Sequence, residues 1–320
     1  MKKQLLCSVL LFLCLGKVAA QTEISNSSNP TSTQDSTQKD YVVELNNNTI
    51  ITGKKVSDDG REVGIMTVDK GLILIPKYQI KSITVAVNMP TVGGRKVFPN
   101  PHPSRYFYSP SGLPIKKGEG YFQSIYYLAF QGQYAITDNW SIGATSTLWA
   151  SPLLLNVKYT NTLFKSTDGK RNLYLATGVQ AGSMTYINPG TWLGVGYVGL
   201  TYGNAESNIT INGGALGLSY MDFDGSYDPV TQRFVTTEFR TTEKRPAISV
   251  SWNQRVSSTA CFMGEVWYVG NLIVGGPGMR FYAGRKNTID VAIIGGYDVY
   301  WTSGIFGVPM ISWTRKMGGK

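Results

Sequence analysis

"QYAITDNWSIGATSTL", residues 133–148, is the stretch that decides the fold class of this chain. It predicts a strand, a short polar turn at residues 137–139 and a second strand. Apolar and polar side chains alternate in both arms, with Tyr134 and Ile136 before the turn and Ile142 after it. Alternate side chains of a strand point to opposite faces of its sheet. The stretch therefore predicts an antiparallel hairpin with one apolar face, which either packs on a core or meets lipid.

The same pattern continues from Arg105 to the end of the chain. Segments rich in β-forming residues alternate with turn residues, and no segment longer than a turn or two shows helical periodicity. We count twelve predicted strands, at residues 105–110, 121–136, 140–150, 153–164, 172–184, 192–203, 208–220, 246–256, 260–270, 277–285, 288–301 and 306–317.

The connections between these strands fall into two classes. Short polar turns are predicted at residues 137–139, 165–171, 204–207, 257–259 and 285–287. The alternate connections, apart from 150–152, are longer or richer in Gly and Pro, and are predicted at residues 111–120, 185–191, 221–245, 271–276 and 302–305. Short turns at one end and longer loops at the other are typical of outer-membrane β-barrels.

The faces of the predicted strands favour lipid over a packed core. In residues 153–162 and 247–255, large apolar side chains alternate with polar ones that are mostly small or uncharged. Trp residues fall near strand ends, where the interfacial girdles of a barrel form: Trp140, Trp149, Trp192 and Trp301. The predicted fold class is all-β, a transmembrane antiparallel up-and-down β-barrel of about 12 strands with its polar face toward the lumen, preceded by a small five-stranded β-domain.

The region before the barrel divides into four parts. Residues 1–20 have the basic start, short apolar core and small-residue cleavage site of a secretory signal peptide. Residues 21–40 are rich in Ser, Thr and Asn and are predicted to be a disordered linker. Residues 41–87 contain five short strand-like segments and form the predicted small periplasmic β-domain. Residues 88–104 are rich in Pro and Gly and are predicted to be a second linker, which places the barrel at residues 105–320.

The composition argues against several classes of function. Charged residues make up only 16% of the 320, while hydrophobic residues make up 42% and there are 36 Gly, which is unusual for a soluble protein. The formal net charge is +10, or about +7 without the three lysines of the signal, but no basic cluster with interleaved aromatic residues is present. We therefore expect no nucleic-acid partner.

Two resemblances follow from quoted motifs. The segment "LNNNTIITGKKVSDDGREV…GLILIPKYQIKSI" resembles the small barrels of Sm-like and SH-three-like folds over about 45 residues. The stretch "NPHPSRYFYSPSGLPIKKGEGYFQS", the turn "YAITDNWSIG" and the closing strand "PMISWTRKM" resemble Bacteroidota-type outer-membrane β-barrel proteins over residues 105–320. That resemblance implies insertion in the outer membrane with both termini periplasmic, and implies no specific activity. The chain departs from the commonest barrel ending, because its last residues are Met-Gly-Gly-Lys rather than an aromatic residue.

Residues suited to catalysis or metal binding are few. A Ser–His site needs a base, and the only histidine of the chain, His102, is expected to be exposed in the second linker, near Ser104. "DFDGSYDP" places Asp222, Asp224 and Asp228 in the longest predicted loop, but lacks the bidentate Glu of a calcium loop. We therefore expect an acidic surface loop there, and no catalytic, cofactor or metal site.

Charged residues on the predicted polar face form the candidate site. Arg255, Glu265, Arg280 and Asp290 fall on four successive predicted strands with alternating sign and with the parity of the lumen, and Lys158 adds a further charge. Buried charges are costly unless paired. The favoured interpretation is an ion-pair network that fills and rigidifies the barrel, and the alternative is a narrow polar pore lined by the same groups.

The predicted function is that of a non-enzymatic outer-membrane β-barrel protein, either a structural or accessory subunit of an envelope complex or a narrow, porin-like channel. Its partners would be outer-membrane lipid and, through residues 41–87, a periplasmic or outer-membrane protein. Two alternatives stay open, an outer-membrane lipid-modifying enzyme and a secreted soluble β-protein that binds glycans. The lone linker histidine argues against the enzyme.

Overall fold

The computed structural model describes residues 39–47, 49–86, 89–92, 95–167, 169, 171–184, 190–228, 230, 233–300 and 303–319. The expected signal peptide, nearly all of the first linker and Trp301 lie outside these residues. Within them, no helix has both the length and the apolar character that a membrane span requires.

The first five strands form the small β-domain predicted from the sequence. They are β1 (Asp40–Leu45), β2 (Ile50–Asp58), β3 (Glu62–Thr67), β4 (Gly71–Pro76) and β5 (Ile80–Val85), with the 3-10 turn η1 (Lys77–Gln79) before the last. Their order in the antiparallel sheet is β4-β3-β2-β1-β5. Val43, Val63, Ile65 and Ile75 form its core. The separate five-stranded sheet is confirmed, and the Sm-like resemblance stays a prediction.

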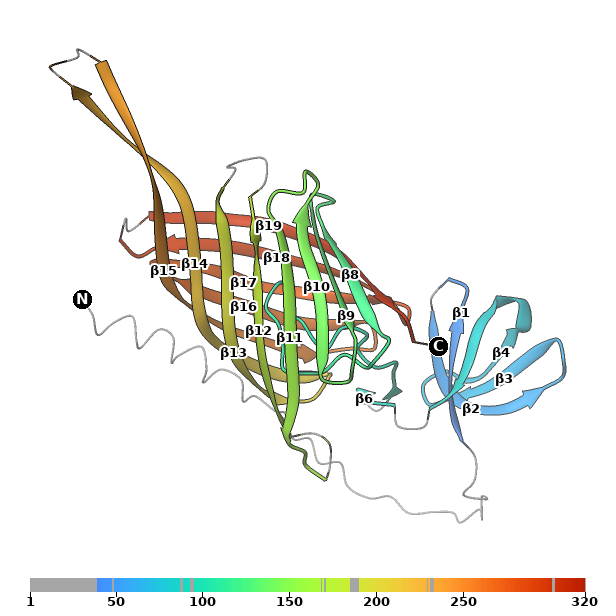
Figure 1. Ribbon diagram of the computed structural model, residues 1–320. Coiled ribbons are helices and arrows are strands. Elements are labelled where there is room, and N and C mark those ends of the chain that lie inside the picture. Colours follow the sequence, from blue (N-terminus) through green and yellow to red (C-terminus); the bar gives the residue numbers. More distant parts are fainter. Residues whose placement is uncertain are drawn as a thin grey trace. The chain divides into compact units, whose positions relative to one another are not determined.

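Twelve antiparallel strands of the described residues close into a barrel, which confirms the predicted fold class (Figure 1). They are β8 (Gly120–Ile125), β9 (Ala129–Ala135), β10 (Trp140–Thr147), β11 (Leu153–Phe164), β12 (Asn172–Ser183), β13 (Trp192–Gly203), β14 (Ser207–Asp228), β15 (Arg233–Arg255), β16 (Ala260–Val269), β17 (Leu272–Ala283), β18 (Asn287–Asp298) and β19 (Ser303–Met317). Each strand pairs with the next along the chain, and β19 pairs with β8 to close the ring. Within the ring every strand has a neighbour on both sides. Beyond Ser219 and before Ala247, β14 and β15 pair only with each other.

The first predicted strand of the barrel is wrong. Residues 105–110 form no strand of the ring, and the predicted single strand 121–136 is instead two strands, β8 and β9. They join at a tight turn in which Leu128 N–H donates to the Ile125 carbonyl at 3.0 Å. Tyr126 and Tyr127 occupy this turn with φ of 52° and 59°. Two tyrosines give no turn signal in a sequence, so the break was not predictable from composition.

The longest predicted loop is also wrong. Much of residues 221–245 continues β14 and β15, which pair in register from Ser207 with Gln254 to Asp228 with Arg233. Residues 272–276, also expected in a loop, belong to β17. The predicted short turns do lie together at one end of the barrel, which we call the near end, and the other turns between successive barrel strands lie at the far end. Residues 111–120, predicted as one of the longer connections, instead lead into β8 at the near end.

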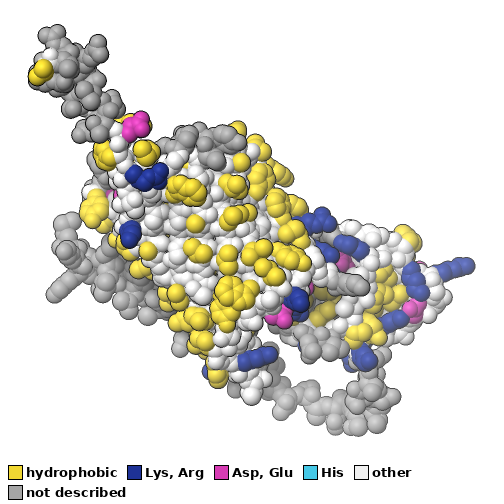
Figure 2. Space-filling model, in the orientation of Figure 1, with side chains coloured by type: hydrophobic (Ala, Val, Ile, Leu, Met, Phe, Trp, Pro, Cys, Tyr) yellow, Lys and Arg dark blue, Asp and Glu magenta, His cyan; other side chains and the backbone are white. Residues whose placement is uncertain are grey.

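The two faces of the barrel wall follow the predicted parity. On β11, Leu153, Leu155 and Val157 are exposed on the outside, while Asn156 and Lys158 are buried inside. Exposed large apolar side chains occur on most of the strands, and Trp140, Trp149 and Trp192 are exposed near strand ends. Figure 2 shows hydrophobic side chains spread over one face of the barrel, with the charged ones toward its margins.

Candidate functional site

The lumen of the barrel is occupied by the chain itself. After the short strands β6 (Thr91–Val92) and β7 (Arg95–Lys96), residues 97–119, which we call the plug segment, pass into the barrel before β8 begins. Figure 1 shows this segment inside the ring of strands. Eleven of its side chains are nearly or fully buried: Val97, Phe98, Asn100, His102, Ser104, Arg105, Tyr106, Phe107, Ser109, Ser111 and Leu113.

The plug segment enters and leaves at the near end. Asn100 donates its side-chain amide to the carbonyl of Ala205, in the turn between β13 and β14, at 3.0 Å. The backbone N–H of Lys117 donates to Asp138, in the turn between β9 and β10, at 2.9 Å. From Asn100 on, residues expected to belong to the second linker therefore lie at or within the near end of the barrel, whereas Phe98 packs with Val42 and Ala86 of the small β-domain.

A tight reversal shapes the innermost part of the plug segment. Tyr106 N–H donates to the Ser109 carbonyl at 2.9 Å, and Ser111 N–H donates to the Ser104 carbonyl at 3.0 Å. A single β-bridge joins Arg105 to Pro110. This small hairpin contains residues 105–110, which were predicted to be the first barrel strand. The prediction arose because the two short arms of the hairpin contain β-forming residues, as a barrel strand does.

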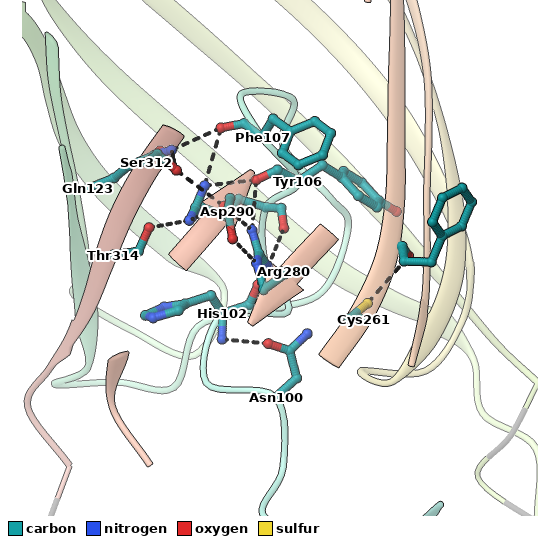
Figure 3. A network of polar contacts seen from close by, with 12 residues as sticks. Asn100, His102, Tyr106, Phe107, Gln123, Cys261, Arg280, Asp290, Ser312 and Thr314 are labelled. Carbon is teal, nitrogen blue, oxygen red and sulfur yellow. Dashed lines mark hydrogen bonds and ion pairs between the residues drawn. The ribbon is translucent and has the colours of Figure 1, made fainter. Parts of the chain in front are cut away.

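One carboxylate holds two arginines at the centre of the lumen. Asp290 of β18 accepts hydrogen bonds from Arg280 of β17 at 2.7 and 3.0 Å, and from Arg105 of the plug segment at 3.1 Å (Figure 3). The Arg280 and Asp290 side chains are 0% exposed, and that of Arg105 is 1% exposed. Arg105 also contacts the Thr314 hydroxyl. The barrel wall thus binds a charge of the plug segment at this point.

Arg280 also binds the backbone of the plug segment. It donates to the carbonyls of His102 at 3.1 Å and Tyr106 at 3.0 Å. Gln123 of β8 donates to the Phe107 carbonyl at 3.1 Å. The carbonyls of Tyr106 and Phe107 also accept from Arg105, at 2.8 and 3.2 Å. A buried carbonyl left without any partner would cost about 1–3 kcal/mol.

Glu265 binds backbone N–H groups rather than an arginine. Its carboxylate accepts from Tyr108 N–H at 3.0 Å, from Ser109 N–H at 2.9 Å and from the Trp267 indole. Among the described residues it has no basic partner within ion-pair distance. Glu265 therefore acts as an anchor for the tip of the plug segment.

Arg255 and Lys158 also contact the plug segment. Arg255 pairs with Glu206 at 2.7 Å and donates to the Phe98 carbonyl at 2.7 Å. Lys158 of β11 donates to the Ser104 carbonyl at 3.1 Å. Of the five predicted charges, the structure thus brings Arg280 and Asp290 together, and all except Asp290 bind plug backbone groups.

Neutral polar side chains complete the contacts. The Tyr106 hydroxyl, on a fully buried ring, contacts Asn208 and lies 2.6 Å from the Thr210 hydroxyl of β14. Ser109 lies 3.0 Å from the Ser249 hydroxyl of β15, and Asn212 donates to Ser109 at 3.0 Å. The plug segment is therefore held by polar contacts to at least seven strands, β8, β11, β14, β15, β16, β17 and β18.

His102 is buried, and the expectation of an exposed linker histidine is wrong. Its side chain is 1% exposed, and its ring lies edge-on to Tyr121 at 6.1 Å between centroids. Burial and the neighbouring guanidinium groups of Arg105 and Arg280 hold the pKa of His102 well below its usual range. The prediction failed because the flanking prolines resemble a linker, whereas here they belong to an irregular segment that is buried inside the barrel.

Beyond the plug segment, toward the far end, the lumen contains a cavity of about 420 Å³, which we call the chamber. Its wall is mostly apolar and includes Leu154, Leu193, Val195, Leu216 and Trp267. The expectation of a polar lumen therefore holds only around the plug segment. The reason is that 192–203 and the middle of β14 are apolar on both faces.

The acidic stretch at residues 222–228 lies on β14 and not in a loop. No group of three or more His, Cys, Asp or Glu suited to a metal ion occurs within the described part of the chain. The Asp222 carboxylate accepts from the neighbouring Phe223 N–H.

Reasoning from the sequence missed the plug segment with its residues Arg105 and Tyr106, and it missed Glu206 in the turn between β13 and β14. A signal was present, since Phe98 in the supposed linker and Tyr106, Phe107 and Tyr108 directly after it give this stretch an aromatic density that a solvated segment does not need. Aromatic side chains at this density indicate burial.

No protein-family model matches the sequence, and no curated protein matches it. Similar solved structures include the NanC porin in a rhombohedral crystal form, at 9% identity and a TM-score of 0.34, covering 63% of this chain and 99% of that one. They also include the CymD monoaromatic hydrocarbon channel, at 11% identity and a TM-score of 0.28, covering 64% of this chain and 90% of that one. At these values neither likeness bears on the ligand or activity of this chain, and the Bacteroidota type stays a prediction.

Proposed function

We propose that the protein is a non-enzymatic outer-membrane channel whose lumen is closed by its own plug segment. The observation that carries this proposal is the combination of a closed twelve-stranded ring, an apolar outer face and a segment inside the ring that is hydrogen-bonded to its wall. A soluble protein would bury the apolar face of its strands. Here Leu155 and Ile293 are 66% and 61% exposed on the outside, while Arg280 and Asp290 are fully buried inside.

The proposed orientation places the near end in the periplasm. Most of the strands have 10 or more residues, such as β11 and β12 with 12 each, which is enough for a tilted strand to cross a bilayer. Short turns face the periplasm in outer-membrane barrels. The small β-domain precedes the plug segment in the chain and would accordingly be periplasmic.

The plug segment makes two kinds of contact with the wall. Its hydrogen bonds to charged wall residues contribute about 1.5–3 kcal/mol each, and water in an opened lumen can replace them. Tyr106 and Phe107 also pack with Cys261, Met263, Tyr282 and Ala292, and this packing is lost when the segment leaves the lumen. Displacement of the plug segment would open a continuous path from the near end to the chamber.

A reversible tether tests this function. The Ser109 and Ser249 hydroxyls lie 3.0 Å apart, one on the plug segment and one on β15. With Cys261→Ser as background, the pair Ser109→Cys and Ser249→Cys should form a disulfide that holds the plug segment. In planar bilayers we expect openings in the reduced protein and none in the oxidised one. The Ser249→Cys variant alone is the control and should conduct alike in both states.

Absence of conductance in the reduced tethered protein and in the control would contradict the channel. Conductance equal in the oxidised and reduced states would instead contradict gating by the plug segment. Formation of the disulfide is checked separately by mobility on a non-reducing gel.

A second function, that of an accessory subunit, is supported by one surface of the small β-domain. Val56, Met66, Leu72 and Leu74 lie on adjacent strands β2, β3 and β4 and are 44–55% exposed, and β4 is an edge strand of its sheet. We propose that this surface binds a periplasmic or outer-membrane protein with a matching apolar patch. Leu72→Glu with Leu74→Glu should abolish in-cell cross-linking through this surface, while Lys70→Glu beside it should leave it intact. Unchanged cross-linking would contradict the surface.

A further inference from the structure

The chamber has the size and wall of a ligand site. Its volume of about 420 Å³ lies within the range of small-molecule pockets in proteins. The apolar side chains of its wall come from β11, β13, β14, β16 and β17, so that they surround the space from several directions. Transfer of the apolar surface of a ligand from water into such a cavity is favourable.

One carboxylate, that of Glu265, and one ammonium group, that of Lys158, line the chamber, and they differ in the number of hydrogen bonds that they make. Glu265 accepts three hydrogen bonds, from Tyr108, Ser109 and Trp267, so its charge is already matched by donors. A ligand cation would therefore gain little by binding to Glu265.

Lys158 is the opposite case. Its side chain is 5% exposed and donates one hydrogen bond, to the Ser104 carbonyl at 3.1 Å. An ammonium group carries three donors. No Asp or Glu of the described residues lies within ion-pair distance of it. A buried cation without a counter-charge is unfavourable, and a ligand anion would supply that charge.

We propose that the chamber binds an amphiphilic monocarboxylate, with its hydrocarbon chain along the apolar wall and its carboxylate at Lys158. The charge of Lys158 selects the head group, and Leu193, Val195 and Trp267 select the chain. This inference rests on the proposed membrane barrel and names its ligand class. It does not need the plug segment to move, because the chamber exists with the plug segment in place.

Three probes of one chain length separate charge recognition from partition into an apolar space. The full-length protein in amphipol is dialysed against radiolabelled decanoate, decanol or decylamine, with unlabelled competitor to define saturable binding and amphipol alone as blank. We expect decanoate to bind at least about tenfold more tightly than decanol, the effect of one charge-assisted hydrogen bond. Decylamine should bind more weakly than decanol.

Variants then assign the site. Lys158→Met keeps the side-chain length and should bring decanoate to the affinity of decanol, whereas Lys244→Met, at an exposed position of β15, should change nothing. Val195→Trp fills the chamber and should remove saturable binding of all three probes. Heat-modifiable gel mobility confirms that each variant retains a closed barrel.

Equal affinity for decanoate and decanol in the unaltered protein would overturn the proposal, as would unchanged discrimination in Lys158→Met. Tighter binding of decylamine would assign the site to Glu265 and also overturn it. The readout is independent of conductance. A protein that binds decanoate and conducts nothing would contradict the channel alone, and a conducting protein that binds none of the probes would contradict this inference alone.

Discussion

The Arg105 guanidinium of the plug segment lies 3.1 Å from the Asp290 carboxylate of β18, although 185 residues separate them in the chain. The same carboxylate also holds Arg280 of β17 at 2.7 Å. One negative charge thus compensates two buried positive charges, one in the wall and one in the plug segment. Docking of the plug segment and integrity of this wall therefore depend on a single side chain.

Asp290→Asn should destabilise the protein strongly. The change keeps the shape of the side chain but leaves two buried guanidinium groups without a counter-charge, which typically costs about 3–5 kcal/mol. We expect the urea midpoint of unfolding in detergent micelles, followed by tryptophan fluorescence, to fall accordingly. Glu243→Gln is the matched control, because Glu243 pairs with Arg245 at an exposed position where ion pairs contribute little. Equal midpoints for the two variants would contradict the central role of Asp290.

The placement of Lys158, Arg280 and Asp290 inside the barrel follows from the sequence by strand parity alone. Period two fixes the face of every residue once a strand is recognised, and antiparallel neighbours in a closed ring bring Arg280 opposite Asp290. Strand parity does not predict which group inside the lumen binds each of the other charged residues. Arg255 pairs with Glu206 from a turn, and Glu265 binds backbone N–H groups of the plug segment.

The plug segment and the β8–β9 turn were not predicted, for physical reasons that differ. Residues 97–104 are shaped by alternate prolines, and a proline-rich segment has the same local signal in solvent and in a lumen. The β8–β9 turn has no Asn, Asp or Gly at its centre, so nothing marks Tyr126 and Tyr127 as a reversal. Closure of the ring imposes it, because β19 must pair with β8.

Acidification should loosen the plug segment through His102. Burial, together with Arg105 and Arg280, lowers the pKa of His102 below its ordinary value of 6.5 in the docked state. The released segment exposes His102 to water and restores that value, so below pH 6.5 the released state binds more protons than the docked one. The contribution of His102 to docking is therefore complete above pH 6.5 and is lost as the pH falls below it. Hydrogen exchange at the Tyr106 and Ser109 amides, corrected for intrinsic rates, should accelerate between pH 8 and pH 5.5.

His102→Gln provides the control for this pH dependence. Glutamine does not titrate, so the corrected exchange rates of the variant should be flat over the same range, whatever their absolute value. The facing charges Arg105, Arg280 and Asp290 are unaltered in this variant. An equal acceleration in both proteins would assign the effect to another group.

Tyr127→Gly should stabilise the barrel. Two consecutive residues with positive φ, closed by the Leu128 to Ile125 hydrogen bond, describe a hairpin turn that favours Asn and Gly. Tyr127 is 77% exposed, so little packing is lost. A non-glycine residue in the left-handed region costs about 1–2 kcal/mol. We expect the free energy of unfolding, measured from urea unfolding, to rise by an amount near the lower of these values. Tyr300→Gly, at an exposed position without positive φ, should give no gain. A loss in Tyr127→Gly would contradict the assigned turn.

Tyr106→Phe should release the plug segment while leaving the ring intact. The lost hydroxyl removes the donor to the buried Asn208 side-chain oxygen, which costs about 1–3 kcal/mol, while Thr210 keeps the Thr201 hydroxyl as a partner. One kcal/mol is about a fivefold change in the fraction released. Trypsin reports that fraction, because it cleaves after Arg105 only when the segment leaves the lumen. We therefore expect cleavage at Arg105 to accelerate by at least about fivefold, with heat-modifiable mobility of the barrel unchanged.

Tyr202→Phe removes a hydroxyl from the outer face, where the side chain is 49% exposed, and should leave cleavage at the original rate. If Tyr106→Phe instead lowered the melting of the whole barrel without faster cleavage at Arg105, the plug segment would be an inseparable part of the core.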